Sequence, residues 1–157
     1  MTWAVVRVRG QVGLRNDVRD TLRMLHLTRT NHCVLVPETD AYRGMLQKVK
    51  DFVTWGEVTP ETVQRLLAAR GRVAGESLAD AHLKGSAFKS VEDLAAAVSA
   101  GTARLGDVPA VTPVLRLPPP RRGFEGIKRG YRAGGALGYR GKVINLLLAR
   151  MLETGAK

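Results

Sequence analysis

Residues 32–58, HCVLVPETDAYRGMLQKVKDFVTWGEV, hold the clearest secondary-structure pattern in the chain. The apolar run 32–36 is typical of a short buried strand, and the proline that follows it cannot continue a sheet ladder. Residues 53–58 predict another strand. Thr39 or Asp40 can cap the helix predicted between them. The apolar residues of that helix recur at helical spacing: Tyr42, Met45, Leu46, Val49, and Phe52 or Val53.

A further strand and helix are predicted ahead of this stretch. Residues 3–9, WAVVRVR, predict a strand with valines on one face and arginines on the other. Asn16 can cap a helix that extends to about Leu25. Residues 1–58 therefore predict an α+β fold in the order β-α-β-α-β. The small three-stranded sheet carries its helices on one face and is similar to ferredoxin-like folds.

The rest of the chain divides into two parts. Residues 59–115 carry six basic and six acidic residues. They predict a charge-neutral helical insertion with helices that begin at Thr59-Pro60 and at Ser90. Residues 116–157 predict the end of a strand, a basic glycine-rich loop, and an amphipathic helix from about residue 141 to 152 that packs on the core.

Residues 116–142 concentrate the positive charge of a chain whose net charge is +11. They include eight basic residues and one acid, with too few aliphatic residues to form a core. Arginine and lysine displace the counterions of phosphates, and glycine lets the backbone approach them closely. Phe124 and Tyr131 can stack on unpaired bases or fold back on the core. The segment predicts an RNA contact that is disordered in the free protein and folds on RNA.

A second basic surface is predicted on the first helix. Arg15, Arg19 and Arg23 are spaced by four residues, so they form a ridge beside the apolar stripe. A ridge of this kind suits a polyanion, but an ordinary solvated helix face has the same pattern. The charge alone therefore leaves both readings open.

The sequence offers little for catalysis. The segment GGALGYRGKV invites comparison with a P-loop, but Ala136 stands where its first glycine is needed and Val143 replaces the magnesium-binding hydroxyl. Cys33 lies in an apolar strand and is expected to be an inert core thiol. The histidines, His26, His32 and His82, do not lie at metal-ligand spacing. We therefore expect no enzyme activity, no cofactor and no metal site.

Composition also predicts a cytoplasmic protein. A single cysteine excludes a disulfide framework within the chain. No apolar run approaches the roughly 20 residues of a membrane span. The N-terminal residues MTWAVVRVRG lack the apolar core of a signal peptide.

Two blocks of sequence resemble a known family. Residues 39–58, TDAYRGMLQKVKDFVTWGEV, closely resemble the signature of the large-subunit ribosomal protein family L-thirty, whose eukaryotic branch is called L-seven. Residues 118–151, from PPPRRGFEGIKRGYRAGGALGYRGK to the terminal helix, are similar to the C-terminal block of long archaeal and eukaryotic members. The chain begins directly at its first strand, without the lysine-rich extension usual in eukaryotic relatives, and so resembles the archaeal type.

This resemblance implies a structural constituent of the large (50S) ribosomal subunit that binds large-subunit rRNA and supports subunit assembly and translation. It implies rRNA and neighbouring ribosomal proteins as partners, with no membrane, small-molecule substrate or self-oligomer. The RNA-binding residues that it implies lie in four regions. They are Arg15, Arg19 and Arg23 in the first helix; Arg29, Asn31 and His32 before the second strand; Arg43, Lys48 and Lys50 in the signature helix; and Arg121, Arg122, Phe124, Lys128, Arg129, Arg132, Arg140 and Lys142 in the basic loop.

Two other classes of function remain open. The helices of residues 59–115 suit a protein–protein docking module or a ribosome assembly factor if they expose an apolar patch. An RNA-modifying or nucleotide-hydrolysing enzyme requires a paired acid–base or metal constellation, which the sequence lacks.

Overall fold

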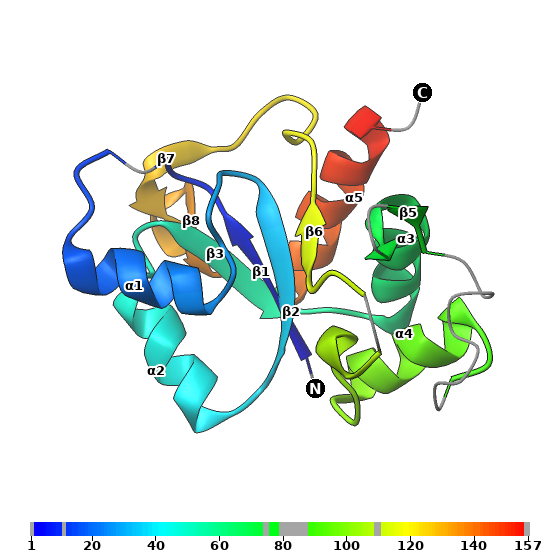
Figure 1. The fold of residues 1–157 in the computed structure, drawn as a ribbon. Helices are drawn as coiled ribbons and strands as arrows, with labels where there is room; N and C mark the ends of the chain where they lie inside the picture. The colour runs from blue at the N-terminus through cyan, green and yellow to red at the C-terminus, as the bar shows by residue number, and fades with distance from the viewer. Residues whose placement is uncertain (1, 11, 74–75, 79–87, 109–110, 156–157) are drawn as a thin grey trace.

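The protein forms a central sheet of six strands in the order β6-β2-β1-β3-β8-β7 (Figure 1). The computed structural model describes residues 2–10, 12–73, 76–78, 88–108 and 111–155, and His82 lies outside them. The strands are β1 (Thr2–Arg7), β2 (His32–Pro37), β3 (Val53–Glu57), β6 (Val114–Arg116), β7 (Gly126–Gly130) and β8 (Gly135–Tyr139), with a separate hairpin of β4 (Arg72–Val73) and β5 (Glu76–Ser77). The helices are α1 (Asn16–Met24), α2 (Asp40–Lys48), α3 (Pro60–Arg70), α4 (Val91–Ala100) and α5 (Ile144–Gly155).

The predicted β-α-β-α-β unit is confirmed as β1-α1-β2-α2-β3. Strand β1 runs antiparallel to both neighbours, with Val5 opposite Val34 on β2 and Trp55 on β3. Of the two predicted caps of α2, Thr39 is the one present, because its side chain accepts a hydrogen bond from the Tyr42 amide at 3.3 Å. The predicted cap of α1 is wrong: Asn16 is its first residue, and the preceding cap position makes no side-chain hydrogen bond.

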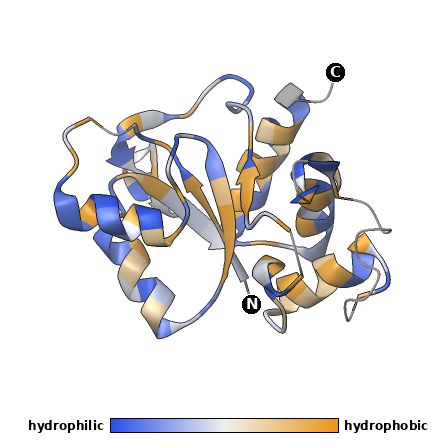
Figure 2. Cartoon of the chain, in the orientation of Figure 1, coloured by the Kyte–Doolittle hydropathy of each residue, from blue (hydrophilic) through white to orange (hydrophobic). Residues whose placement is uncertain are grey.

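A layer of helices covers each face of the sheet (Figure 1). Alternate residues of β1 point to opposite faces. Trp3 and Val5 pack with α1 and α2, whereas Ala4 and Val6 pack with α3, α4 and α5. Cys33 belongs to the second core and is fully buried, and burial raises the pKa of its thiol to about 12. Figure 2 shows hydrophobic colour over much of β2 and β6 and hydrophilic colour over much of α1.

The helices predicted within residues 59–115 are present as α3 and α4. Thr59 accepts a hydrogen bond from the Thr62 amide at 3.3 Å, and Ser90 accepts one from the Asp93 amide at 3.2 Å. Helix α4 ends at Gly101, whose φ of 82° is the left-handed conformation typical of a glycine C-cap. Both helices share the core that covers Ala4 and Val6 of β1.

The segment predicted as a glycine-rich loop contains two strands of the sheet. Strand β8 pairs in parallel with β3, with Thr54 opposite Gly138, and β7 pairs in parallel with β8. The pattern concealed these strands because every residue of β7 is exposed and three residues of β8 are glycine or alanine. Backbone pairing at the sheet edge therefore determines their structure more than side-chain burial does.

Candidate nucleic-acid interface

The basic ridge on α1 is exposed along its length. Arg15, Arg19 and Arg23 are all exposed, from the residue before the helix to its last turn. Arg15 lies 3.3 Å from the carboxylate of Asp17, and an exposed pair of this kind contributes little stability. The ridge therefore presents positive charge to solvent over most of the helix.

A buried arginine lies beneath this ridge and was not predicted. Arg7 is only 2% exposed and lines a hollow of about 100 Å³ together with Arg19 and Arg23. Its Nη1 donates to the carbonyl of Leu27 at 2.6 Å, and its Nη2 has no acceptor among the described residues. Burial lowers the pKa of Arg7. A buried cation without a carboxylate partner makes the hollow favourable for an anion.

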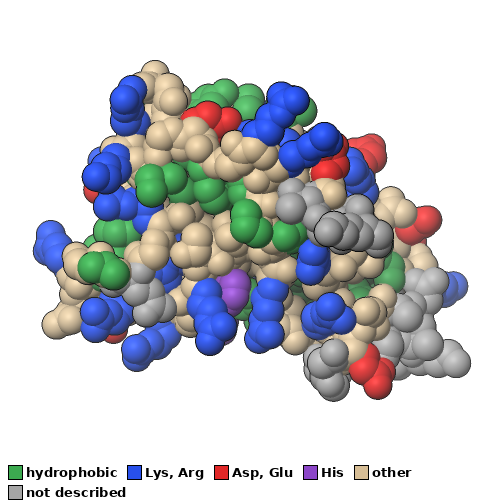
Figure 3. Space-filling view, turned by 90° about the horizontal axis from the view of Figure 1, so that it is seen from above, with side chains coloured by type: hydrophobic (Ala, Val, Ile, Leu, Met, Phe, Trp, Pro, Cys, Tyr) green, Lys and Arg blue, Asp and Glu red, His purple; other side chains and the backbone are tan. Residues whose placement is uncertain are grey.

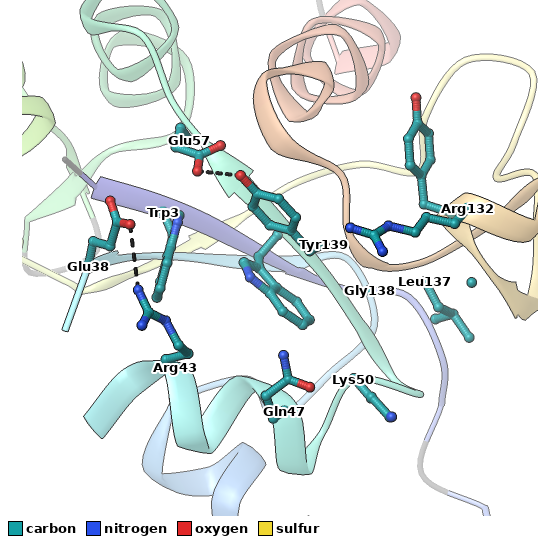
Figure 4. Close-up of a pocket in the computed structure, with 13 residues that line it drawn as sticks. Trp3, Glu38, Arg43, Gln47, Lys50, Glu57, Arg132, Leu137, Gly138 and Tyr139 are labelled. Carbon is teal, nitrogen blue, oxygen red and sulfur yellow. Dashed lines mark hydrogen bonds and ion pairs between the residues drawn. The ribbon is translucent and has the colours of Figure 1, made fainter. Parts of the chain in front are cut away.

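A larger groove lies between α2 and the strand pair β7–β8. It has a volume of about 570 Å³ and is lined by Arg43 and Lys50 on one side and by Arg132 and Tyr139 on the other (Figure 4). The two blocks of sequence that resemble the ribosomal family are well separated, since the first ends at residue 58 and the second begins at residue 118, yet both line this groove. We call it the α2–β8 groove.

The cations that line the groove differ in whether they form ion pairs. Arg43 forms ion pairs with Glu38 at 3.9 Å and Asp40 at 3.3 Å, and its guanidinium lies 5.9 Å from the centre of the Trp3 ring. Lys50 and Arg132 form no ion pair with any residue that the structure describes. The uncompensated charges of these two side chains are therefore available to a ligand.

Aromatic and hydrogen-bonding groups complete the groove. The Tyr139 hydroxyl donates to Glu57 at 2.5 Å, and this hydrogen bond is the main reason that the pKa of Tyr139 is raised to about 12. The Tyr139 ring lies 6.2 Å from that of Trp55. The indole N–H of Trp3 is buried without an acceptor in the described part of the chain. The groove thus combines cations that have no ion-pair partner among the described residues with an exposed aromatic ring.

Most of the predicted contact residues lie on the surface. The exposed ones are Arg15, Arg19, Arg23, Arg29, Arg43, Lys48, Lys50, Arg121, Arg122, Lys128, Arg129, Arg132 and Lys142. Asn31, in the turn before β2, and His32, the first residue of β2, are half-buried. Phe124 is half-buried and packs against the core, which is the alternative that its sequence context left open.

Arg140 is turned inward, contrary to its predicted exposure as an RNA contact. It is 5% exposed; its Nε donates to the Thr54 hydroxyl at 2.8 Å and its Nη2 to the Ala136 carbonyl at 2.7 Å. Its guanidinium also lies 5.1 Å from the centre of the Tyr131 ring. Burial is the main reason that the pKa of Arg140 is lowered. Through these hydrogen bonds the buried side chain connects β8 to β3 and so helps to position the lining of the groove.

Arg150 on α5 performs a similar task and had no signal in the sequence. Its Nη2 donates to the carbonyls of Arg121 at 2.8 Å and Gly123 at 2.6 Å, and its Nη1 lies 3.0 Å from Glu125. These bonds attach the start of the basic segment to the terminal helix, so both ends of that segment are held by the protein itself.

His32, the first residue of β2, should make the stability of the protein depend on pH. Burial lowers the pKa of His32, with repulsion from Arg116, Arg29 and Arg7 adding to the effect. Its folded pKa lies below the unfolded value of about 6.5, so the unfolded chain binds more protons in that window. The free energy of unfolding should therefore fall as pH drops below about 6.5 and level off beneath the folded pKa.

The His32→Gln variant should show a smaller loss of stability on acidification than the unmodified protein, as measured by urea denaturation between pH 7 and pH 5. His26→Asn is the control, because His26 is an exposed histidine with a φ of 61° that asparagine tolerates. Equal pH dependence in the His32→Gln variant and the unmodified protein would contradict the assignment.

Comparison with known proteins connects this arrangement to a family. The family described as Ribosomal protein L30p/L7e matches residues 3–53. The "Large ribosomal subunit protein uL30" of Methanococcus vannielii is 52% identical over 155 residues, which cover 97% of this chain and all of that protein. The chain belongs to the uL30 family of large-subunit ribosomal proteins. The uL30 protein of Methanopyrus kandleri is 51% identical over 92% of this chain and all of its own length, and that of Methanococcus maripaludis is 48% identical over 97% and all of its own.

Both sides of the groove lie in regions that are similar to known uL30 proteins. The family match covers β1 to the start of β3, including all of α2, and the archaeal relatives extend the similarity over nearly the whole chain. No group of three or more potential metal ligands lies together among the described residues of this uL30 chain. No helix in the described ranges is long and apolar enough to cross a membrane.

Proposed function

We propose that this uL30 protein is a structural constituent of the large subunit of the cytoplasmic ribosome and binds large-subunit rRNA through its exposed basic surfaces. The observation that carries the proposal is the α2–β8 groove, in which Lys50 and Arg132 stand without ion-pair partners among the described residues beside the exposed ring of Tyr139. Phosphates satisfy the cations and unpaired bases stack on aromatic rings, so RNA fits both components of this lining.

The α1 ridge supplies a second contact in this proposal. Arg19 and Arg23 are exposed above the small hollow beneath which Arg7 is buried. A phosphate seated at that hollow gains charge-assisted hydrogen bonds from the two exposed guanidiniums and compensates the buried one. The role requires no chemical step, so we propose no catalysis and no cofactor. Neighbouring ribosomal proteins are the other partners that family membership supports.

The test is a salt series with large-subunit rRNA fragments. The double variant Lys50→Gln, Arg132→Gln should bind roughly tenfold more weakly, and its slope of log affinity against log salt should be shallower by about 2, since each lost phosphate contact removes about one unit. The matched control is Arg65→Gln, Lys89→Gln, which removes one arginine and one lysine from exposed positions in and next to the helices of residues 59–115.

The two doubles separate a specific groove from general charge. Both remove two positive charges, so an equal loss of affinity in both would contradict the role of the groove. A flat salt response of the unmodified protein would contradict rRNA binding itself. Point substitutions are preferable to deleting residues 121–140, because that deletion removes β7 and β8 from the sheet.

A docking module in residues 59–115 has weaker support. The exposed large apolar residues in the described part of the chain are Val12, Met24, Ile127, Tyr131, Tyr139 and Leu146, and all of them lie outside this segment. The described faces of α3 and α4 therefore lack the apolar patch that such a module requires.

A further inference from the structure

A second cluster of arginines lies at the opposite edge of the sheet from the α2–β8 groove. We call it the β6 patch and define it as Arg29, His32, Arg70, Arg72 and Arg116. Strand β6 forms one edge of the six-stranded sheet, whereas β7, next to β8, forms the other. Figure 3 looks at the end of the molecule seen from above in Figure 1 and shows Lys and Arg side chains gathered around a histidine.

Backbone pairing brings these residues together from three distant segments. Arg116 on β6 stands directly opposite His32 on β2 in the antiparallel register. Directly opposed residues project from the same face of a sheet. The Thr112 amide donates to the carbonyl of Arg72 at 2.9 Å, which ties the end of the α3 segment to the start of β6. The juxtaposition is therefore fixed by the fold.

Three of the arginines surround one concavity. Arg70, Arg72 and Arg116 line a hollow of about 520 Å³ together with Thr112 and Val114. This lining offers three guanidinium groups and one hydroxyl beside the apolar side chain of Val114. Arginine guanidiniums bind phosphate oxygens through two parallel hydrogen bonds, which suits them to a sugar–phosphate backbone.

The charge of the β6 patch lacks compensation from the described protein. Arg29, Arg70 and Arg116 form no ion pair with any described residue, and Arg72 donates to the hydroxyl of Ser77 at 3.1 Å. Glu76 lies next to Ser77 on β5 and engages in an interaction of its own. Holding several cations close together costs repulsion that a bound polyanion removes.

We propose that the β6 patch binds the phosphodiester backbone of a second segment of rRNA, so that the protein bridges two RNA segments across its sheet. The proposal rests on the rRNA binding proposed above. It gives residues 59–115 a role in RNA contact, because Arg70 and Arg72 belong to that segment although its overall charge is neutral.

The experiment compares three double variants that each remove two positive charges. Arg70→Gln, Arg116→Gln tests the β6 patch, Lys50→Gln, Arg132→Gln tests the groove, and Arg65→Gln, Lys89→Gln is the control. Arg65 is exposed on the same helix as Arg70 but does not line the hollow. Arg72 is left intact because it bonds to Ser77. Thermal unfolding of each variant checks that the fold is kept.

Affinity and hydroxyl-radical footprints are then measured on large-subunit rRNA. The β6 double should bind roughly tenfold more weakly, with a salt slope shallower by about 2. It should also fail to protect one stretch of rRNA that the groove double still protects. The groove double should fail to protect a different stretch, which the β6 double still protects. The control should match the unmodified protein in affinity, in salt slope and in footprint.

Each contrary result has a distinct meaning. Loss of the same protected stretch in both test doubles would overturn the bridge, because it would show one RNA segment instead of two. Unchanged affinity and footprint in the β6 double, with the groove double impaired, would overturn the β6 patch and leave the proposed function intact. An unchanged footprint with reduced incorporation into reconstituted subunits would replace RNA by an acidic protein partner. Salt-independent binding by the unmodified protein would instead defeat the proposed function.

Discussion

The Gly56→Ala variant is expected to lose about 3 kcal/mol or more of its free energy of unfolding, because overpacking against immobile atoms is costly. A Cβ on Gly56 would overlap the backbone carbonyl of Gly141 and would lie 3.0 Å from the Cβ of Ile144. The backbone of Gly141, in the turn just before α5, cannot rotate away as a flexible side chain does. The expected response is displacement of α5 from β3, and with it a misplaced β8.

Chemical denaturation at fixed pH measures this effect, with Gly44→Ala as the control. Gly44 lies inside α2, and a Cβ there meets no atom within 4 Å. Alanine in a helix interior is favoured over glycine by about 1 kcal/mol, so the control should be slightly more stable than the unmodified protein. Similar stabilities for the two variants would show that β3 and α5 are packed less closely than described.

The Arg140→Met variant is expected to lose about 2–3 kcal/mol, because hydrogen bonds from a charged donor contribute more than neutral ones and the buried acceptors lose their partner. The side chain bonds to the Thr54 hydroxyl, which in turn donates to the Gly138 carbonyl at 2.8 Å. Its removal therefore disturbs both strands of the β3–β8 pair. Hydrogen exchange of the β8 amides should accelerate more than that of the β1 amides.

The control for Arg140→Met is Arg132→Met, an exposed position where a substitution should change stability by no more than about 0.5 kcal/mol. Arg140→Lys should recover only part of the loss, since an ammonium lacks the planar fork that reaches Thr54 and Ala136 together. Unchanged exchange at β8 in Arg140→Met would show that the strand is held by backbone pairing alone.

The predicted elements that agree with the structure are those whose side chains carry a periodic signal. The stripe of α2 and the caps at Thr59 and Ser90 are local features, so the sequence alone indicates them. Arg7 shows where this reasoning fails. The alternation in residues 3–9 predicts a strand with one face exposed to solvent. Strand β1 instead lies between β2 and β3 with helices on both sides, so both of its faces are buried.

The sites were only partly predictable for a related reason. Composition and family resemblance indicated which cations lie on the surface, as Lys50 and Arg132 do. They could not indicate the α2–β8 groove, whose two sides are joined by the pairing of β8 with β3. The inward turn of Arg140 depends on an acceptor at Thr54, 86 residues away. The β6 patch was not predicted because residues 59–115 have no net charge, which conceals the arginines of that segment that the fold brings close to Arg116.

The division of β1 between two cores has a consequence for the order in which the chain folds. Residues 1–58 contain all the buried residues of the core around Trp3 and Val5, but the residues that cover Ala4 and Val6 come mainly from positions beyond 58 and extend to α5 near the C-terminus. A nascent chain that has formed its first three strands therefore exposes an apolar sheet face until translation is nearly complete. Contacts of such long sequence separation form slowly, and exposed sheet faces of this kind are prone to aggregate. The last helix thus serves as the closing step of folding, and truncation within it should lower the yield of soluble protein well before it alters any basic surface.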